Sequence, residues 1–384
     1  MDRRRLIGYV ESTALTIGFC SAIWAPMLGM IFGMGQVTSA EENRTLAKLP
    51  AVTRDVSTWI AFSQAYKEYF HDHFGFRGTL VQLQTSVKRE VLGISSSPDV
   101  VVGRGEWLFY AGYHALDNYR NIHPLTEPEL GAWERLFAAR RDFLIKRRTP
   151  FFVIIAPDKH SIYPEYVPMR ITRLGHLSRL DQLVAYFRQH STVPLIDVRR
   201  ALLQAKSSNR PLYYHTDTHW NAFGAYVGYR QLMAAMAPVV PTLQPFPESE
   251  APVVRSFRLG DLARMLGDTS LGEDCDDVRP SPLVTSIPDG RARSISIRSG
   301  GEGLPTLVMF RDSFGTALGD LLSRHFRKAV YVTSDLFDRD LIDRERPDVV
   351  IVEMVERALM SPAPSDPDFG LKMNLAAGKA ANAR

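Results

Sequence analysis

Cysteine is scarce in this 384-residue chain. One of its two cysteines, Cys20, lies in an apolar N-terminal segment, and the other, Cys275, lies in an acidic stretch. Residues so placed are not expected to pair, so no disulfide framework is predicted and cysteine usage indicates no compartment. The formal net charge is only +4, and no block of lysine and arginine resembles a nucleic-acid-binding arm. We therefore expect no nucleic-acid partner, and the mild charge surplus favours anionic partners only weakly.

The sequence also has no second long apolar run and no internal repeat. The single apolar run follows Arg3, Arg4 and Arg5, and it carries no charge over 23 residues from Ser12 to Met34. A membrane-spanning helix needs about 20 such residues. The arginines are expected to stay on the cytoplasmic side of the membrane, which sends the rest of the chain to the other side. A signal peptide that is cleaved near residue 40 is the alternative, and it places the body in the same compartment.

The rest of the chain alternates between strand and helix patterns. The apolar run FFVIIA at 151–156 is typical of a strand buried on both faces. Such alternation predicts βαβ units and a mainly parallel sheet. The expected strands are 151–156, 195–198, 306–310, 329–333 and 348–352, and the expected helices are 59–92, broken at Gly75, 128–146, 178–189, 221–236 and 315–326.

Composition divides the chain into four parts. We predict an anchor over residues 1–36, a linker over 37–58, a catalytic domain over 59–360 and a disordered tail over 361–384. Within the catalytic domain, residues 239–303 are rich in Pro, Gly, Asp and Arg, so we expect an insertion of hairpins and loops there.

A carboxylate and an imidazole lie two positions apart, as Asp217 and His219, just before the predicted helix 221–236. In an extended segment such residues point to the same side, so their side chains can meet. The carboxylate can then set the tautomer of the imidazole and stabilise its cationic form. Taken alone, the pair could equally be a surface turn.

Ser313 lies between the predicted strand 306–310 and the predicted helix 315–326. A serine at such a corner is exposed at the carboxyl end of the sheet, where open α/β proteins bind ligands. Serine needs a base to become a nucleophile, and His219 is the best-placed candidate. The backbone amides of Ser313 and Gly315 are candidate donors to an oxyanion.

Two alternatives to a triad of Ser313, His219 and Asp217 stay open. Asp312 and Ser313 could simply cap the following helix, because both residue types are good caps. Asp312 could also replace Asp217 as the acid that orients His219, although adjacent side chains usually diverge. We favour the triad because both motifs fall at the ends of sheet-associated elements.

Several motifs together resemble the alginate O-acetyltransferase family of SGNH-hydrolase-like proteins. They are ENRTL at 42–46, DHFGFR at 72–77, GEWLF at 105–109, APDK at 156–159, DTHW at 217–220 and RDSF at 311–314, so the resemblance spans roughly residues 42–359. It implies a three-layer α/β/α SGNH-like fold with Asp217, His219 and Ser313 as the triad. The order of these residues is reversed relative to ordinary SGNH esterases, but triads are recognised by geometry rather than by chain order.

The resemblance also implies a function. It indicates a periplasmic enzyme that transfers acetyl through an acetyl-serine onto hydroxyls of an exported polysaccharide, with a membrane-bound O-acyltransferase as the acetyl supplier. A glycan acetylesterase and a non-catalytic polysaccharide-binding subunit are the alternatives. No cofactor is expected. The chain ends in a short tail, so we expect no separate carbohydrate-binding module, and alginate, cellulose or another exopolysaccharide all stay open as the acceptor.

Four further residues are candidates for substrate binding: Lys159, Tyr163, Trp220 and Arg311. For the first two the competing interpretation is a solvated loop; Trp220 could instead wall the site, and Arg311 could pair with a neighbouring carboxylate. No metal site is predicted, because His71 and His73 have poor spacing for one helix face and no ligand set completes a site. The acidic cluster at 273–277 lacks the spacing of a calcium loop and is predicted to be a solvated loop.

Overall fold

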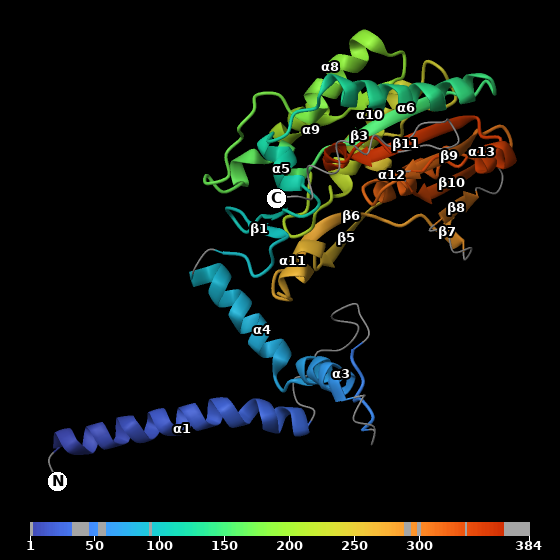
Figure 1. The fold of residues 1–384 in the computed structure, drawn as a ribbon. Coiled ribbons are helices and arrows are strands. Elements are labelled where there is room, and N and C mark those ends of the chain that lie inside the picture. Colours follow the sequence, from blue (N-terminus) through green and yellow to red (C-terminus); the bar gives the residue numbers. More distant parts are fainter. Residues whose placement is uncertain are drawn as a thin grey trace. The chain divides into compact units, whose positions relative to one another are not determined.

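The computed structural model describes residues 3–32, 46–52, 59–91, 94–287, 293–297, 301–334 and 336–364. The chain divides into two compact units, residues 1–96 and 97–384 (Figure 1). The predicted catalytic domain begins at residue 59, whereas the contacts group residues 59–96 with the N-terminal helix. Most of the predicted linker and tail lies outside the described residues.

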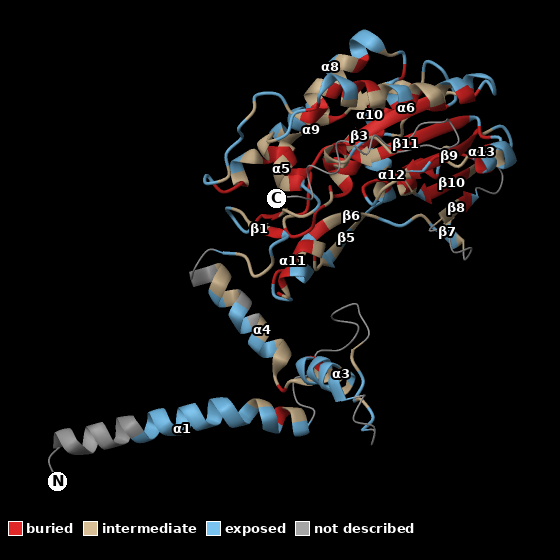
Figure 2. Cartoon of the chain, in the orientation of Figure 1, coloured by how far each residue is buried: buried red, intermediate tan, exposed pale blue. Residues whose placement is uncertain are grey.

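Helix α1 (Arg3–Ile31) contains the predicted apolar run. Its stretch Thr13–Ile31 has a mean hydropathy of 1.7 and is largely exposed (Figure 2). By length and composition this helix can cross a membrane, and a signal sequence near the N-terminus would have the same properties.

The predicted helix 59–92 is interrupted where Gly75 was expected to break it. The chain at Gly75 passes so close to α1 that a Cβ atom there would lie 2.1 Å from the carbonyl oxygen of Pro26. Only glycine allows this approach. The elements on either side are α3 (Trp59–His73), α4 (Arg77–Ser86) and the π-helix η2 (Val87–Val91).

The C-terminal unit is built on a seven-stranded sheet with the strand order β4-β3-β11-β9-β10-β8-β7. Strands β4, β3, β11, β9 and β10 are parallel, whereas β8 and β7 join antiparallel at one edge. The predicted α/β fold with a mainly parallel sheet is confirmed. The bounds are β3 (Phe151–Ala156), β4 (Leu195–Asp197), β7 (Val284–Ile287), β8 (Arg293–Ile297), β9 (Thr306–Arg311), β10 (Lys328–Thr333) and β11 (Val349–Val355).

Helices cover both faces of this sheet. Along β3, Phe152 and Ile154 pack in one core with α9, α10 and α12, whereas Phe151 and Val153 pack in a second core with α6, α8 and α13. Because side chains alternate along a strand, the central strands are buried on both faces (Figure 2). The helices are α6 (Glu127–Ile145), α8 (Arg179–His190), α9 (Arg199–Ala205), α10 (Ala222–Met236), α12 (Gly315–Leu322) and α13 (Arg339–Glu345).

The predicted insertion 239–303 contains hairpins, and part of it extends the main sheet. Strands β5 (Val253–Arg258) and β6 (Glu273–Val278) form an antiparallel pair, with α11 (Asp261–Leu266) between them. Strands β7 and β8 pair with each other, and β8 also pairs with β10. The acidic stretch 273–277 is therefore a paired strand, and the prediction of a solvated loop is wrong. Backbone pairing with β5 holds it in the fold.

Shorter elements complete the described part of the C-terminal unit. Trp107 and Phe109 are buried. The remaining bounds are β1 (Val100–Val102), β2 (Leu108–Tyr110), α5 (Ala115–Arg120), α7 (Lys159–Ile162) and the 3₁₀ turns η3 (Pro164–Tyr166), η4 (Lys206–Ser208), η5 (Glu248–Glu250) and η6 (Glu356–Met360).

Candidate active site

Asp217 and His219 lie in a loop whose two ends pair with each other just before α10. Tyr213 and Trp220 form an isolated antiparallel bridge across the loop. Asn221 caps α10, because its side-chain oxygen accepts hydrogen bonds from the amides of Phe223 and Gly224 at 3.0 and 3.1 Å. This cap lies two residues after His219 and fixes where α10 begins.

The side chains of Asp217 and His219 are in direct contact. One carboxylate oxygen of Asp217 accepts from the backbone amide of His219 at 3.0 Å and contacts the ring Nδ1 at 2.7 Å. Burial by itself would raise the pKa of Asp217, but the hydrogen bonds from His219 and the charges of His219 and Arg258 hold that pKa well below its usual range. Asp217 is therefore an ionised acceptor for Nδ1–H, which leaves Nε2 to accept a proton.

Ser313 stands at the corner between β9 and α12, and its side chain is exposed. The neighbouring Asp312 shapes this corner, because its carboxylate accepts from the amides of Phe314 at 2.8 Å and Val355 at 2.7 Å. The amide of Asp312 donates to Glu353 at 3.2 Å. The carboxylate of Asp312 therefore holds the turn between β9 and α12 and does not orient His219, which removes that alternative.

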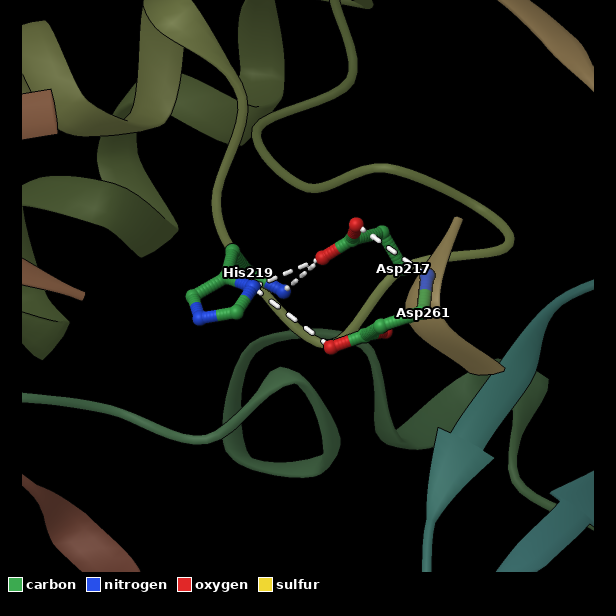
Figure 3. A group of neighbouring side chains, drawn as sticks. All are labelled: Asp217, His219 and Asp261. Atoms are coloured by element: carbon green, nitrogen blue, oxygen red, sulfur yellow. Dashed lines mark hydrogen bonds and ion pairs between the residues drawn. The ribbon is translucent and has the colours of Figure 1, made fainter. Parts of the chain in front are cut away.

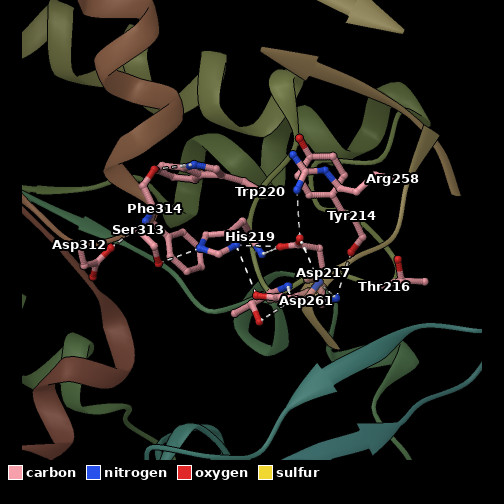
Figure 4. A network of polar contacts seen from close by, with 12 residues as sticks. Tyr214, Thr216, Asp217, His219, Trp220, Arg258, Asp261, Asp312, Ser313 and Phe314 are labelled. Carbon is pink, nitrogen blue, oxygen red and sulfur yellow. Dashed lines mark hydrogen bonds and ion pairs between the residues drawn. The ribbon is translucent and has the colours of Figure 1, made fainter. Parts of the chain in front are cut away.

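The two motifs meet across 94 positions of sequence. His219 Nε2 lies 2.8 Å from Ser313 Oγ, so serine, imidazole and Asp217 form one hydrogen-bonded chain (Figure 4). The ring of Phe314 packs against the imidazole with ring centroids 4.8 Å apart. This arrangement can move a proton from the serine hydroxyl to Nε2 while Asp217 balances the charge that develops.

The hairpin insertion contributes contacts that the sequence pattern did not indicate. Arg258, at the end of β5, donates to the second carboxylate oxygen of Asp217 at 3.2 Å. The amide of Asp261, at the start of α11, lies 3.3 Å from the same oxygen. Gly260 lies so close to the loop that a Cβ there would be 2.0 Å from the carbonyl oxygen of Thr216. No spacing or motif relates these residues to the loop, because they lie some 40 positions further along the chain and reach Asp217 only through the fold.

A second carboxylate lies near the same imidazole. Asp261 has one oxygen 3.7 Å from His219 Nδ1, and its other oxygen accepts from the amide of Thr218 at 2.7 Å. Burial and the nearby charge of Asp217 raise the pKa of Asp261. Figure 3 shows both carboxylates on the Nδ1 side of the ring.

Asp217, His219 and Asp261 offer a set of atoms close enough to hold a metal ion (Figure 3). The donor set does not favour one, because the Asp217 oxygens already accept from N–H groups of His219, Arg258 and Asp261. An arginine that contacts the same carboxylate would also repel a cation. The contacts therefore fit an oriented imidazole better than a metal centre.

Lys159 is buried, which contradicts both its predicted solvated position and a contact with sugar. Its Nζ donates to the carbonyl oxygens of Tyr214, His215 and Asp217 at 3.0, 3.0 and 2.7 Å. These bonds use all three of its N–H donors. Burial lowers the pKa of Lys159 to about 7, against the opposing effect of Asp217 and other nearby carboxylates. The residue holds the loop rather than a ligand.

Glu273, at the start of β6, supports the same loop. Its carboxylate accepts from the amides of His215 at 2.9 Å and Thr216 at 2.7 Å. One residue of the acidic cluster therefore holds the backbone of the loop through hydrogen bonds.

Two more predicted substrate contacts are buried. The hydroxyl of Tyr163 accepts from the amide of Leu212 at 2.9 Å, and burial raises its pKa to about 12. The indole N–H of Trp220 donates to the carbonyl oxygen of Phe314 at 3.1 Å, and the ring is buried, so it has no free face for a sugar.

Arg311 and the candidate oxyanion donors lie at the turn between β9 and α12. Arg311 is partly buried and donates to the carbonyl oxygen of Asp312 at 2.8 Å. Gly315 is packed tightly, since a Cβ there would lie 2.6 Å from Glu353. The amides of Ser313 and Gly315 stay candidates for an oxyanion site, because they belong to the corner and first turn of α12.

A cavity of about 550 Å³ opens beside Ser313. Its walls are mainly apolar and come from α6, the end of β11 and the segment after β2. The buried acid Glu353 also lines it; burial and the adjacent charge of Asp312 raise the pKa of Glu353 well above its usual range. The turn at Ser313 therefore borders a large space with mainly apolar walls, which also include the charged residues Arg140, Arg311, Asp312, Glu353 and Arg357.

The sequence is similar to that of a known protein family. A family model described as the SGNH hydrolase-like domain of the acetyltransferase AlgX matches residues 100–291, half of the chain. The match includes Asp217 and His219 and ends before Ser313.

Two curated relatives are both named probable alginate O-acetylase AlgJ. The protein of Pseudomonas putida is 30% identical over 142 residues, which cover 36% of this chain and 34% of the relative. The protein of Azotobacter vinelandii is 24% identical over 178 residues, which cover 46% of this chain and 43% of the relative. The matched segments thus span less than half the length of these relatives.

Solved structures with a related arrangement include Bacillus cereus PatB1, with a TM-score of 0.49 and 15% identity over 71% of this chain and 99% of that one. The O-acetyltransferase domain of Pseudomonas putida AlgJ gives a TM-score of 0.41 and 22% identity over 71% of this chain and 95% of that one.

The family match falls on the β1 to β7 region, which includes the loop of Asp217 and His219 and the hairpin that supports it. It confirms the SGNH-like fold and the predicted resemblance. This chain belongs to the SGNH hydrolase-like domain family of the acetyltransferase AlgX.

Proposed function

We propose that this protein is a membrane-anchored O-acetyltransferase that acts in the bacterial periplasm. In this proposal α1 anchors the chain in the inner membrane, with Arg3, Arg4 and Arg5 on the cytoplasmic side. Ser313 is the nucleophile, His219 the general base and acid, and Asp217 the orienting carboxylate. The acceptor is a hydroxyl group of an exported polysaccharide, and a membrane-bound O-acyltransferase supplies the acetyl group.

The observation that carries the proposal is the contact between His219 Nε2 and Ser313 Oγ at 2.8 Å, continued to Asp217 at 2.7 Å. A nucleophile, a base and an orienting acid within hydrogen-bond reach are the requirement for acyl transfer through a serine ester. The family of the chain and the names of the matched relatives support acetyl transfer to a polysaccharide.

The proposed reaction has two steps. Ser313 Oγ attacks the acyl carbon, its proton passes to His219, and the same proton then leaves with the donor's leaving oxygen. In the second step His219 takes the proton of a sugar hydroxyl, whose oxygen attacks the acetyl-serine and restores Ser313. The amides of Ser313 and Gly315 are the proposed donors to the oxyanion in both steps.

The direct test uses the full chain in detergent with a chromogenic acetyl ester, with and without an oligosaccharide acceptor. We expect acetylated Ser313 by mass spectrometry and acetyl transfer that depends on the acceptor. Ser313→Ala should lower kcat by about 10⁴-fold or more while the protein stays folded. Release of acetyl only to water would favour an esterase, and activity retained in Ser313→Ala would end the proposal.

A further inference from the structure

The aromatic residues of α3 take no part in the proposed reaction, yet they gather on one side of that helix. Each residue turns an α-helix by about 100°, so side chains that recur every three or four positions share a face. By this spacing the aromatic side chains fall within an arc of about 100°, whereas Gln64 and Glu68 lie on the opposite side. The members of this aromatic face are Trp59, Phe62, Tyr66, Tyr69 and Phe70.

The aromatic face is open rather than packed in a core. Trp59 is 58% exposed, and Tyr66 and Phe70 are each 43% exposed. Figure 2 shows most of α3 as exposed. The rings of Phe62 and Tyr66 stack with their centroids 6.0 Å apart, and those of Tyr66 and Tyr69 follow at 6.3 Å. A continuous exposed patch of large apolar side chains marks a surface that contacts something else.

The end of α3 is held against the apolar helix α1. A Cβ atom at Gly75, two residues after α3, would lie 2.1 Å from the carbonyl oxygen of Pro26. A Cβ atom at Gly29 would lie 2.7 Å from the ring of Phe76. Pro26 and Gly29 belong to the stretch Thr13–Ile31, which is apolar enough to cross a membrane, and they lie near its C-terminal end. With α1 in a bilayer, α3 therefore starts from the level where α1 leaves the hydrocarbon.

The charges of α3 give no reason to expect an anionic partner. Lys67 is offset by Glu68 and Asp72 on the same helix. Binding must then come from burial of the aromatic rings, as it does for helices that lie in a membrane surface. Tryptophan and tyrosine are enriched at that boundary because their rings are apolar while one edge can still bond to water or a headgroup.

We infer that α3 lies in the membrane–water interface with its aromatic face in contact with phospholipid. The inference rests on the proposed insertion of α1 in the membrane and goes beyond it, because it adds a second lipid contact outside the span. The partner is the bilayer itself, recognised through apolar burial at the headgroup boundary. This contact restricts the motion of the N-terminal unit relative to the membrane surface.

The test attaches a nitroxide spin label to single cysteines of the full chain in phosphatidylcholine vesicles. Oxygen, which concentrates in lipid, and a nickel chelate, which stays in water, compete to relax the label. Tyr66→Cys and Phe70→Cys report on the aromatic face, and Glu68→Cys is the matched control on the opposite side of α3. Cys20 is replaced by serine in these variants, whereas Cys275 is buried and is not expected to react.

Oxygen should relax the labels at positions 66 and 70 more strongly than nickel does, and the order should be reversed at position 68. Hydrolysis of a chromogenic acetyl ester at the rate of the unlabelled chain shows that each variant is folded. Labels that nickel reaches equally at positions 66 and 68 would overturn the inference. Labels at position 66 that become shielded only when an oligosaccharide is added would also overturn it, because the aromatic face would then bind sugar.

A label on native Cys20 separates this inference from the proposed anchor, because Cys20 lies within the apolar stretch of α1. If oxygen dominates at Cys20 while nickel dominates at position 66, α1 is in the membrane and only the interfacial position of α3 is wrong. If nickel dominates at Cys20, the anchor and the inference both fail. Loss or retention of turnover in Ser313→Ala tests the acyl transfer independently of either result.

Discussion

The two halves of the candidate site are built in different ways. The turn that carries Ser313 is built largely from adjacent residues: it joins β9 to α12, and Asp312 accepts from the amide of the residue two positions on. Two hydrogen bonds between Asp312 and β11 complete it. The loop that carries Asp217 and His219 is held by distant residues, namely Lys159, Arg258, Asp261 and Glu273. The candidate nucleophile is thus positioned mainly by sequence neighbours and one adjacent strand, whereas the candidate base depends on several distant segments.

The largest effect is expected from a change at Asp217, the carboxylate that orients His219. Asp217→Asn should keep the fold but reduce kcat by about 10⁴-fold, because an amide can hold the wrong tautomer of His219 and cannot balance its positive charge. Steady-state kinetics with an acetyl ester and a thermal melt measure the two properties. A loss below tenfold would show that Asp261 or another group can orient the imidazole instead.

The next largest effect is expected from Lys159, which is buried and holds the loop around Asp217 by hydrogen bonds. Lys159→Met removes three hydrogen bonds and leaves buried carbonyl oxygens without donors, so the free energy of unfolding should fall by about 3 kcal/mol. Urea unfolding measures this change, and kcat should fall as well because the backbone of Asp217 loses its anchor.

Lys206→Met is the matched control for that substitution. Lys206 also donates to a backbone carbonyl, that of Ile162, but it is partly exposed and pairs with Glu165 near the surface. Its loss should cost about 1 kcal/mol or less. Equal destabilisation by both substitutions would contradict the role assigned to Lys159.

A smaller effect is expected from the hairpin. Arg258→Ala removes the guanidinium that contacts Asp217, and kcat should fall about tenfold, the magnitude of one charge-assisted hydrogen bond. Arg255→Ala, on the same strand, removes an exposed ion pair with Asp276 and should leave kcat unchanged. If Arg255→Ala lowered kcat as much as Arg258→Ala, the effect would belong to the hairpin as a whole.

The smallest effect is a pH dependence of stability. Glu356 accepts from the amide of Asp158 and the hydroxyl of Ser161, beneath the helix that carries Lys159. Burial, with the charge of Asp158, raises the pKa of Glu356 from 4.5 to about 7. The folded state therefore binds more protons than the unfolded state between these values, so the free energy of unfolding should fall as pH rises from about 4.5 to 7.

Glu356→Gln isolates this contribution, because an amide does not titrate. Denaturant melts at several pH values should show a flatter pH dependence for this variant. An unchanged slope in the variant would assign the pH dependence to other groups, such as Asp158.

Several features of the fold and the site were accessible from the sequence because their signals are local. The run FFVIIA predicts β3, and Asn221 predicts the start of α10, since both follow from short-range alternation and capping. The predicted positions of Asp217, His219 and Ser313 at the ends of elements agree with the geometry that brings them together.

The errors share one cause. The sequence predicts a sugar contact or a solvated loop for Lys159 and a solvated loop for Glu273, because charged residues are usually exposed. Both instead satisfy backbone groups of the loop around Asp217, which a linear sequence gives no means to pair with them. Burial of a charged side chain depends on its partners, and those partners come from other parts of the chain.

By itself, the sequence determined the alternation of strands and helices, the apolar N-terminal helix and the residue types able to carry acyl transfer. Only the tertiary structure decided that Arg258 and Asp261 contact Asp217, that Lys159 holds the loop and that a cavity borders Ser313. The reason is physical: strand and helix patterns repeat over a few residues, whereas hydrogen-bond partners and cavity walls are set by the packing of distant segments.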